Sequence, residues 1–141
     1  MLELSKDKIR EIASELECGM VCYCKIENQE LVSIVDFDHH IYAEEEDWAE
    51  QIEKIEKERE KYLMIEPMDS HESFRVMDDF IETVDNDKLA HELKIALEKK
   101  QPFQNFKYVI NNSGEYREKW FKFREQKYNE WVEQQLEMYN N

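Results

Sequence analysis

The chain has 141 residues and a net charge of −15, because it carries 34 acidic against 19 basic side chains. A charge of this sign repels nucleic acid and anionic membranes, so we expect direct binding to neither. No apolar run approaches the ~18 residues that a membrane span needs, and the N-terminus lacks the apolar segment of a signal peptide. Three cysteines without the spacing of a disulfide framework suit a reducing compartment. We therefore expect a cytoplasmic protein.

The first part of the chain predicts a helix and a β-hairpin. Ser5 can cap a helix that ends near Gly19, because glycine commonly follows a helix C-terminus. Residues 20–26 and 31–37 predict two strands, joined by a polar turn at 27–30.

A second helix and a third strand follow. Residues 44–60 carry a narrow apolar stripe of Trp48, Ile52 and Ile55, which predicts a surface helix that covers one face of the sheet. Residues 62–65 are a short continuous apolar run and predict the third strand.

The rest of the sequence has helical signals throughout. Asp69 or Ser70 can cap the first of four helices, and Asp87 can cap the second. Pro102 opens the third, and Gly114 separates it from a long last helix. The apolar residues expected to face inward on the first two of these helices are Phe74, Met77, Phe80, Ile81, Val84, Leu89, Ala90, Leu93, Ala96 and Leu97.

Together these elements predict an α+β fold. It has a small three-stranded antiparallel sheet, an N-terminal helix, a covering helix and a helical C-terminal half. A chain of this length can bury the core of one domain. We expect a single domain over residues 1–141, with a mixed helix and strand part over about 1–67 and a helical part over 68–141.

Residues 102–132 place nine aromatic side chains among six lysines and arginines. At about 100° per residue, Tyr116, Trp120 and Trp131 share one broad side of the last helix, and glutamates lie opposite. A nucleic-acid surface would need its aromatics exposed, with basic residues gathered around them. The pattern therefore predicts a packed core.

The segment 36–47 gathers residue types that ligate divalent ions, with Asp36, Asp38, His39 and His40 as the candidates. It matches no established metal-binding spacing, and its acids also suit the start of a helix. We therefore expect no bound metal and no other cofactor.

The sequence gives no support to catalysis. Cys22 and Cys24 point to one side of a strand and are interpreted as small buried hydrophobes, because a zinc site needs a second such pair. No feature identifies a histidine as the base that a catalytic thiol requires. Phosphate-binding glycine loops, hydrolase motifs and kinase signatures are missing.

Arg117 and Arg124 lie two turns apart within the aromatic side of the last helix. An unpaired buried charge is very costly, so each arginine must reach solvent, stack on a ring or meet a carboxylate. The rings and acids predicted as partners are Trp120, Phe121, Tyr128, Asp78, Asp79 and Glu82. Alternatively, one arginine stays open in a cleft and binds an anionic ligand or a carboxylate of another protein.

Four motifs between about residues 72 and 132 occur in order: "FRVMDDFIETVDNDKLAHELKIAL", "PFQNFKYVI", "REKWFKFREQ" and "EWV". They resemble a bacterial uncharacterised protein family of the UPF type, with its Phe-Ile-Glu, Pro-Phe-x-x-Phe-Lys and Trp-Phe-x-Phe motifs. The segment 99–105 lacks the glycine and paired arginines of the corresponding turn in that family. The resemblance implies a shared fold and brings no activity or site residues.

Strong acidity, an aromatic-rich half and the lack of catalytic motifs favour a non-enzymatic interaction module whose partner is another protein. One alternative is a regulator that imitates nucleic acid and occupies a DNA- or RNA-binding protein. Another is a metal-dependent enzyme that uses the acidic and histidine segment 36–47.

Overall fold

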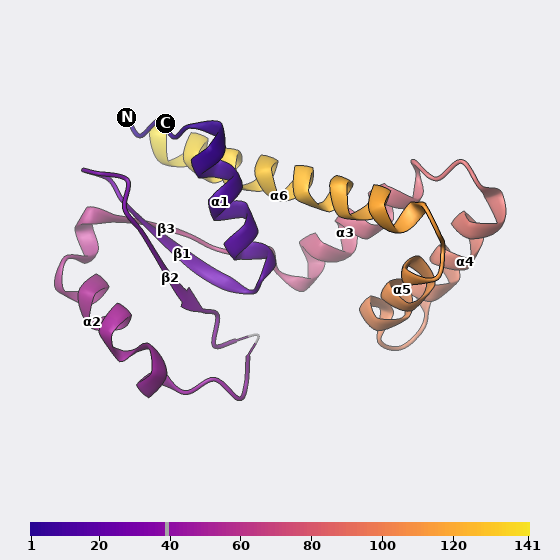
Figure 1. The fold of residues 1–141 in the computed structure, drawn as a ribbon, viewed down its shortest axis with the longest axis horizontal. Coiled ribbons are helices and arrows are strands. Elements are labelled where there is room, and N and C mark those ends of the chain that lie inside the picture. Colours follow the sequence, from indigo (N-terminus) through magenta and orange to yellow (C-terminus); the bar gives the residue numbers. More distant parts are fainter. Residues whose placement is uncertain (39) are drawn as a thin grey trace. The chain divides into compact units, whose positions relative to one another are not determined.

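The computed structural model of the protein describes residues 1–38 and 40–141 (Figure 1). The chain forms two compact units, one made of Met1–Pro67 with Tyr128–Asn141 and the other made of Met68–Lys127. A single domain with a mixed part over about 1–67 and a helical part over 68–141 stays a prediction. In chain order, the helices and strands are α1 (Lys6–Glu17), β1 (Met20–Lys25), β2 (Leu31–Val35), α2 (Ala49–Lys57), β3 (Tyr62–Ile65), α3 (Ser70–Ile81), α4 (Asp87–Glu98), α5 (Pro102–Asn111) and α6 (Tyr116–Asn140).

The fold is α+β, with the predicted N-terminal helix, three-stranded antiparallel sheet and helical C-terminal half. The strands lie in the order β2-β1-β3, and both pairs are antiparallel. In the predicted hairpin Cys22 pairs with Ser33, and on the other edge of β1 it pairs with Ile65 of β3. No helix among the described residues is both long enough and apolar enough to cross a membrane.

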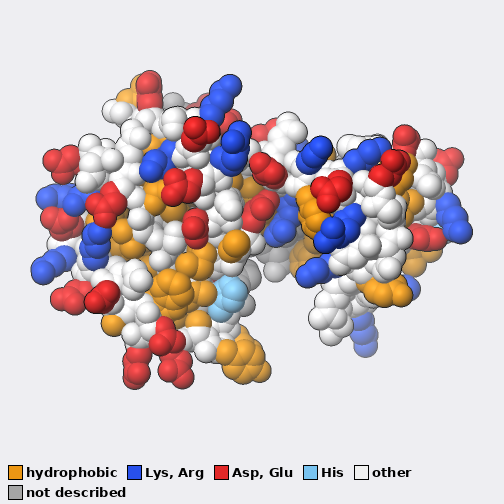
Figure 2. Space-filling model, viewed as in Figure 1, with side chains coloured by type: hydrophobic (Ala, Val, Ile, Leu, Met, Phe, Trp, Pro, Cys, Tyr) orange, Lys and Arg blue, Asp and Glu red, His pale blue; other side chains and the backbone are white. Residues whose placement is uncertain are grey.

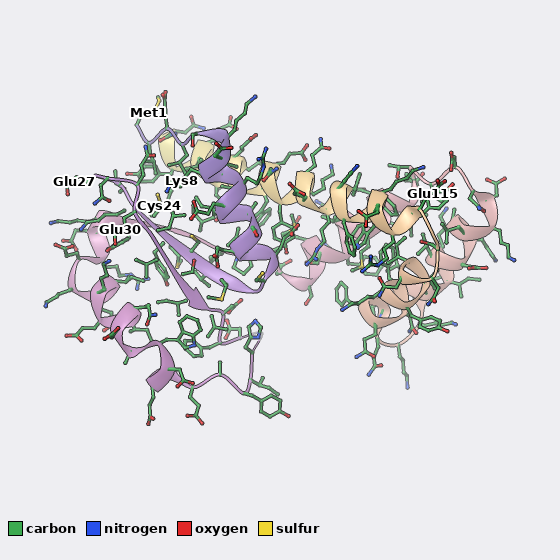
Figure 3. The ribbon with its side chains drawn as sticks, in the orientation of Figure 1. Met1, Lys8, Cys24, Glu27, Glu30 and Glu115 are labelled. Atoms are coloured by element: carbon green, nitrogen blue, oxygen red, sulfur yellow. The ribbon has the colours of Figure 1, made fainter. Side chains whose placement is uncertain are left out.

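The two faces of the sheet are covered by different helices, because alternate residues of β1 point to opposite sides. Cys22 and Cys24 are fully buried on the side of α1, and Figure 3 shows Lys8 of α1 beside Cys24. Tyr23 points to the side of α2, in an apolar cluster with Ile55. The other members of this cluster are Val32, Ile34, Phe37, Trp48, Ile52 and Tyr62.

Helix α1 begins and ends at the predicted residues. The Ser5 hydroxyl accepts a hydrogen bond from the backbone N–H of Lys8 at 3.1 Å. Gly19 follows the helix with a φ of 81°, a conformation that favours glycine. The segment before α1 is held by Asn140 of α6, whose side chain makes two hydrogen bonds of 2.9 Å with the backbone of Leu2.

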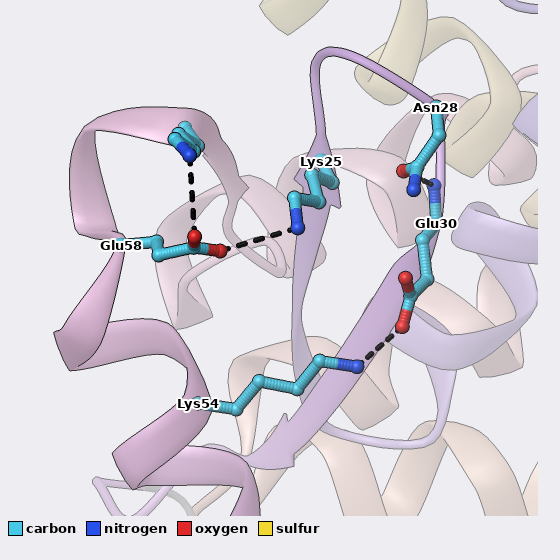
Figure 4. A network of polar contacts seen from close by, with 6 residues as sticks. Lys25, Asn28, Glu30, Lys54 and Glu58 are labelled. Atoms are coloured by element: carbon cyan, nitrogen blue, oxygen red, sulfur yellow. Dashed lines mark hydrogen bonds and ion pairs between the residues drawn. The ribbon is translucent and has the colours of Figure 1, made fainter.

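The helix predicted over residues 44–60 covers the sheet as expected but is shorter, because short 3-10 helices flank α2 on both sides. Ion pairs fasten its C-terminal end to the hairpin (Figure 4). Glu58 accepts from Lys25 and from Lys61, each at 3.2 Å, and Lys54 pairs with Glu30. These contacts fix the end of α2 next to the turn between β1 and β2.

An aromatic cluster forms the core of the unit Met68–Lys127. The ring of Trp120 lies 5.2 Å from that of Phe80 and 4.9 Å from that of Phe106, both edge-on, and Phe123 lies 5.4 Å from Phe80. Trp120 is only 6% exposed. The core predicted for the aromatic segment is therefore confirmed at Trp120 and Phe106.

Two details of this unit differ from the prediction. The cap of α4 is Asn86, whose side chain accepts from the backbone N–H of Leu89 at 3.1 Å, and Asp87 is the first helical residue. On α3, Val76 is buried whereas Phe74 is 37% exposed. The inward stripe runs through Val76 and Phe80, four residues apart, which places Phe74 at its edge.

Substituting the two glycines should separate backbone strain from a side-chain contact. Gly19 and Gly114 have φ values of 81° and 71°, so alanine should cost about 1–2 kcal/mol at either position. A Cβ at Gly19 would also lie 2.4 Å from Nε2 of His40, whereas one at Gly114 meets nothing within 4 Å. In urea unfolding, Gly19→Ala should therefore lose more stability than Gly114→Ala. Equal losses would show that His40 does not rest on Gly19.

Candidate functional site

A cleft of about 310 Å³ lies between α2 and the sheet face that α2 covers. It is lined by apolar, aromatic and charged side chains, namely Val21, Tyr23, Ile34, Val35, Asp36, Phe37, Asp38, Ile52, Ile55, Glu56 and Arg59. Figure 2 shows hydrophobic side chains surrounded by acidic ones over β2 and α2. The cleft belongs wholly to the unit that contains the sheet.

The cleft exists because α2 covers its sheet face with a narrow apolar stripe. Ile55 is 2% exposed, whereas Ile52 and Phe37 are only half-buried. Tyr23 of β1 is half-buried too and belongs to the same apolar cluster. An aromatic and aliphatic floor therefore stays partly accessible.

Charged groups line the same cleft, three of them acidic and one basic: Asp36, Asp38, Glu56 and Arg59. Burial raises the pKa of Tyr23, and the nearby positive charge of Arg59 opposes that rise. The guanidinium of Arg59 is therefore close enough to act on the Tyr23 hydroxyl, which is protonated at neutral pH. The surplus of carboxylates suits a positively charged ligand.

The structure brings two of the four predicted metal-ligand candidates, Asp36 and Asp38, into this cleft. The backbone N–H of Asp38 donates to the carboxylate of Asp36 at 3.1 Å, which is a turn-forming contact. The exposed ring of His40 lies against Gly19, and His39 falls outside the described residues. Within the described part of the chain, no three Asp, Glu, His or Cys side chains are grouped as metal ligands.

Sequence reasoning did not select Tyr23, Phe37, Glu56 or Arg59 as site residues. A signal for Tyr23 was present, because strand alternation puts it on the face opposite Cys22 and hence under the predicted covering helix. Glu56 and Arg59 gave no comparable signal among the many charges of this segment.

Cys22 and Cys24 are buried as predicted, and Cys18 is exposed. Burial raises the pKa of Cys22 to about 11, and it also raises the pKa of Cys24. Because the thiolate is the reactive form, neither side chain is suited to act as a nucleophile at neutral pH.

Thiol labelling should reveal this difference directly. At pH 8, Cys18 should react with Ellman's reagent at least about tenfold faster than Cys22 and Cys24, because only Cys18 is exposed. Cys18→Ser should remove the fast phase and leave the slow ones. Three equal rates in the folded protein would contradict the burial of the β1 cysteines.

The predicted anion or partner site in the helical unit is only partly assembled. The guanidinium of Arg117 stacks on the ring of Phe121, 4.7 Å from its centroid, and Nε donates to Asn111 at 3.3 Å. Its carboxylate partner is Glu118, at 4.0 Å on the same helix, and not an acid of α3. The ring stacking predicted for Arg117 is therefore present at Phe121, on a side chain that is 49% exposed.

The other predicted members of that site are spread over the unit. Trp120 is buried in the aromatic core, and Arg124 is half-buried. The predicted acidic partners, Asp78, Asp79 and Glu82, are exposed on and just after α3. A site that combines them with the arginines stays a prediction.

Truncating Arg117 should have a small effect on stability. A stacked cation at an exposed site contributes about 0.5–1 kcal/mol, and removal of one member of a buried ion pair costs about 3–5 kcal/mol. Thermal or urea unfolding of Arg117→Ala should therefore show a loss below ~1 kcal/mol. Lys122→Ala, an exposed position on the same helix, serves as the control. A loss of about 3–5 kcal/mol would contradict the exposed position of Arg117.

The chain is similar to proteins of one uncharacterised family. A family model described as "Uncharacterised protein family (UPF0158)" matches residues 31–140, which include β2, α2 and most of the cleft. A UPF0158 protein of Pseudomonas aeruginosa is 29% identical over 83 residues, which are 59% of this chain and 54% of that protein. The match thus spans about half the length of this relative. No solved structure matches.

Proposed function

We propose that this chain, which belongs to the uncharacterised protein family UPF0158, is a non-enzymatic cytoplasmic module that binds a basic surface on another protein. The observation that carries this proposal is the division of charge between its two units. The unit Met68–Lys127 has 12 acidic and 11 basic side chains, whereas the rest of the chain has 22 acidic and 8 basic ones. Almost all of the net negative charge therefore belongs to the unit that contains the sheet and the cleft.

A charge imbalance of this size favours a positively charged partner. Complementary charge steers encounter and excludes partners of the same sign. Shortly after the cleft residue Asp38 in sequence come two large apolar residues, Ile41 and Tyr42. Their exposed fractions are 79% and 92%. Exposed apolar side chains within a polar surface are a common feature of protein interfaces.

Neutralising acids in one unit at a time tests the proposal. The first variant carries Glu50→Gln, Glu53→Gln and Glu56→Gln on α2. The control carries the same change in charge in the other unit, and its substitutions are Glu92→Gln, Glu98→Gln and Glu125→Gln. Each set replaces three exposed acids. In affinity purification from lysate of the source bacterium, the α2 variant should lose proteins that the wild type and the control retain.

Salt dependence provides the second readout. The retained partners should be basic proteins and should dissociate as the ionic strength rises from about 0.05 M to 0.5 M, because salt screens exposed charges. Circular dichroism of each variant confirms that it is folded. Wild-type protein that reproducibly captures nothing, or variants that lose the same partners equally, would overturn the proposal.

The same charge division favours a nucleic-acid-mimicking regulator as the second candidate function. In that case the captured proteins would bind DNA or RNA, and an added oligonucleotide would displace them. Partners that an oligonucleotide leaves in place would exclude mimicry and retain the broader proposal.

A further inference from the structure

We propose that the cleft between α2 and the sheet binds an arginine side chain presented by a partner protein. This inference rests on the proposed function. It adds that the group which the basic partner inserts into the cleft is a guanidinium. It is carried by three features of the cleft together: its size, its partly accessible aromatic floor and its surplus of carboxylates.

The volume of the cleft limits what it can take. At about 310 Å³ it lies at the lower end of the range for small-molecule sites, roughly 300–1,000 Å³. One long side chain fits within this space. A side chain also needs no enclosure, since the rest of its peptide remains outside.

The lining matches the two parts of an arginine. Its aliphatic stem can contact the apolar floor, where Ile34 and Ile55 are buried and Ile52 is half-buried. Tyr23 and Phe37 supply rings on which a planar guanidinium can stack. A lysine ammonium lacks this planar face and binds carboxylates as a point charge.

The carboxyl-bearing residues Asp38 and Glu56 reach the cleft from two different elements of the unit. Asp38 follows β2, and Glu56 lies on α2. A guanidinium can donate to two carboxylates at once because its N–H groups point in several directions. The carboxylates also disfavour anionic ligands at this place, although Arg59 supplies one positive charge.

Arg59 gives the inference a further consequence. Its charge already acts on Tyr23, so an incoming guanidinium must approach a cation of the same sign. Removing that charge should therefore strengthen binding, which is the opposite of the effect of removing a carboxylate. A general loss of structure would weaken binding in both cases.

The test uses two peptides that differ in one charge. The probe is acetyl-Gly-Ala-Arg-Ala-Gly-amide, and the control replaces arginine with citrulline, its neutral isostere. Titration into ¹⁵N-labelled full-length protein, followed by NMR, reports which residues are contacted. The arginine peptide should shift backbone signals of Tyr23, Phe37 and Asp38, and the citrulline peptide should bind at least about fivefold more weakly.

Variants locate the binding within the unit. Asp38→Asn with Glu56→Gln should weaken the arginine peptide about fivefold. Glu133→Gln with Glu137→Gln removes the same charge from exposed positions of α6 in the same unit, outside the cleft, and it should have an effect below about twofold. Arg59→Gln should strengthen binding about twofold.

The outcomes separate this inference from the proposed function. Equal binding of the two peptides, or equal effects of the two double variants, overturns the arginine site. If basic proteins are still captured in that case, the proposed function stands without it. If the peptide binds the cleft as expected and no protein is captured, the site stands and the proposed function falls.

Discussion

The alternation of side chains along β1 is the constraint on which the unit Met1–Pro67 with Tyr128–Asn141 depends. Three short strands are stable only when their apolar faces are covered, and β1 is the central strand with both faces buried or half-buried. Cys22 and Cys24 meet the α1 side, and Tyr23 meets the α2 side. The same two-residue period therefore produces two unreactive thiols on one face and the floor of the cleft on the other.

The two covering helices differ in how much apolar surface they bring. α1 buries Ile12, Ala13 and Leu16 almost completely, whereas on α2 only Ile55 is buried. The rest of α2 is mostly polar, with three glutamates and two lysines, and its C-terminal end is held by ion pairs of Glu58 and Lys54. Exposed ion pairs contribute little energy but specify orientation. A helix attached in this way covers its sheet face incompletely, which is the physical origin of the cleft.

Much of the fold could be predicted because its signals are local. Ser5 and Gly19 bound α1, Pro102 opens α5, and each predicted strand is present. Errors arose where two nearby residues could serve the same role, as with Asn86 and Asp87 at the start of α4. The long helix α6 posed a different difficulty, because its residues belong to two units. A single helical wheel averages two buried stripes, one through Trp120 and one through Tyr128, Val132 and Leu136, and it therefore placed the half-exposed Arg117 within the aromatic side.

The cleft could not be predicted for a related reason. Its residues come from β1, β2 and the neighbourhood of α2, and each has an ordinary structural role in its own segment. Asp36 and Asp38 are metal-ligand types in the sequence, yet in the fold they line one cleft with Tyr23, Phe37 and Glu56. An acidic side chain in so acidic a sequence carries little information by itself. Beside aromatic rings and an accessible apolar floor, the same carboxylate favours a cation with a flat, weakly hydrated face, and that preference belongs to the fold rather than to any motif.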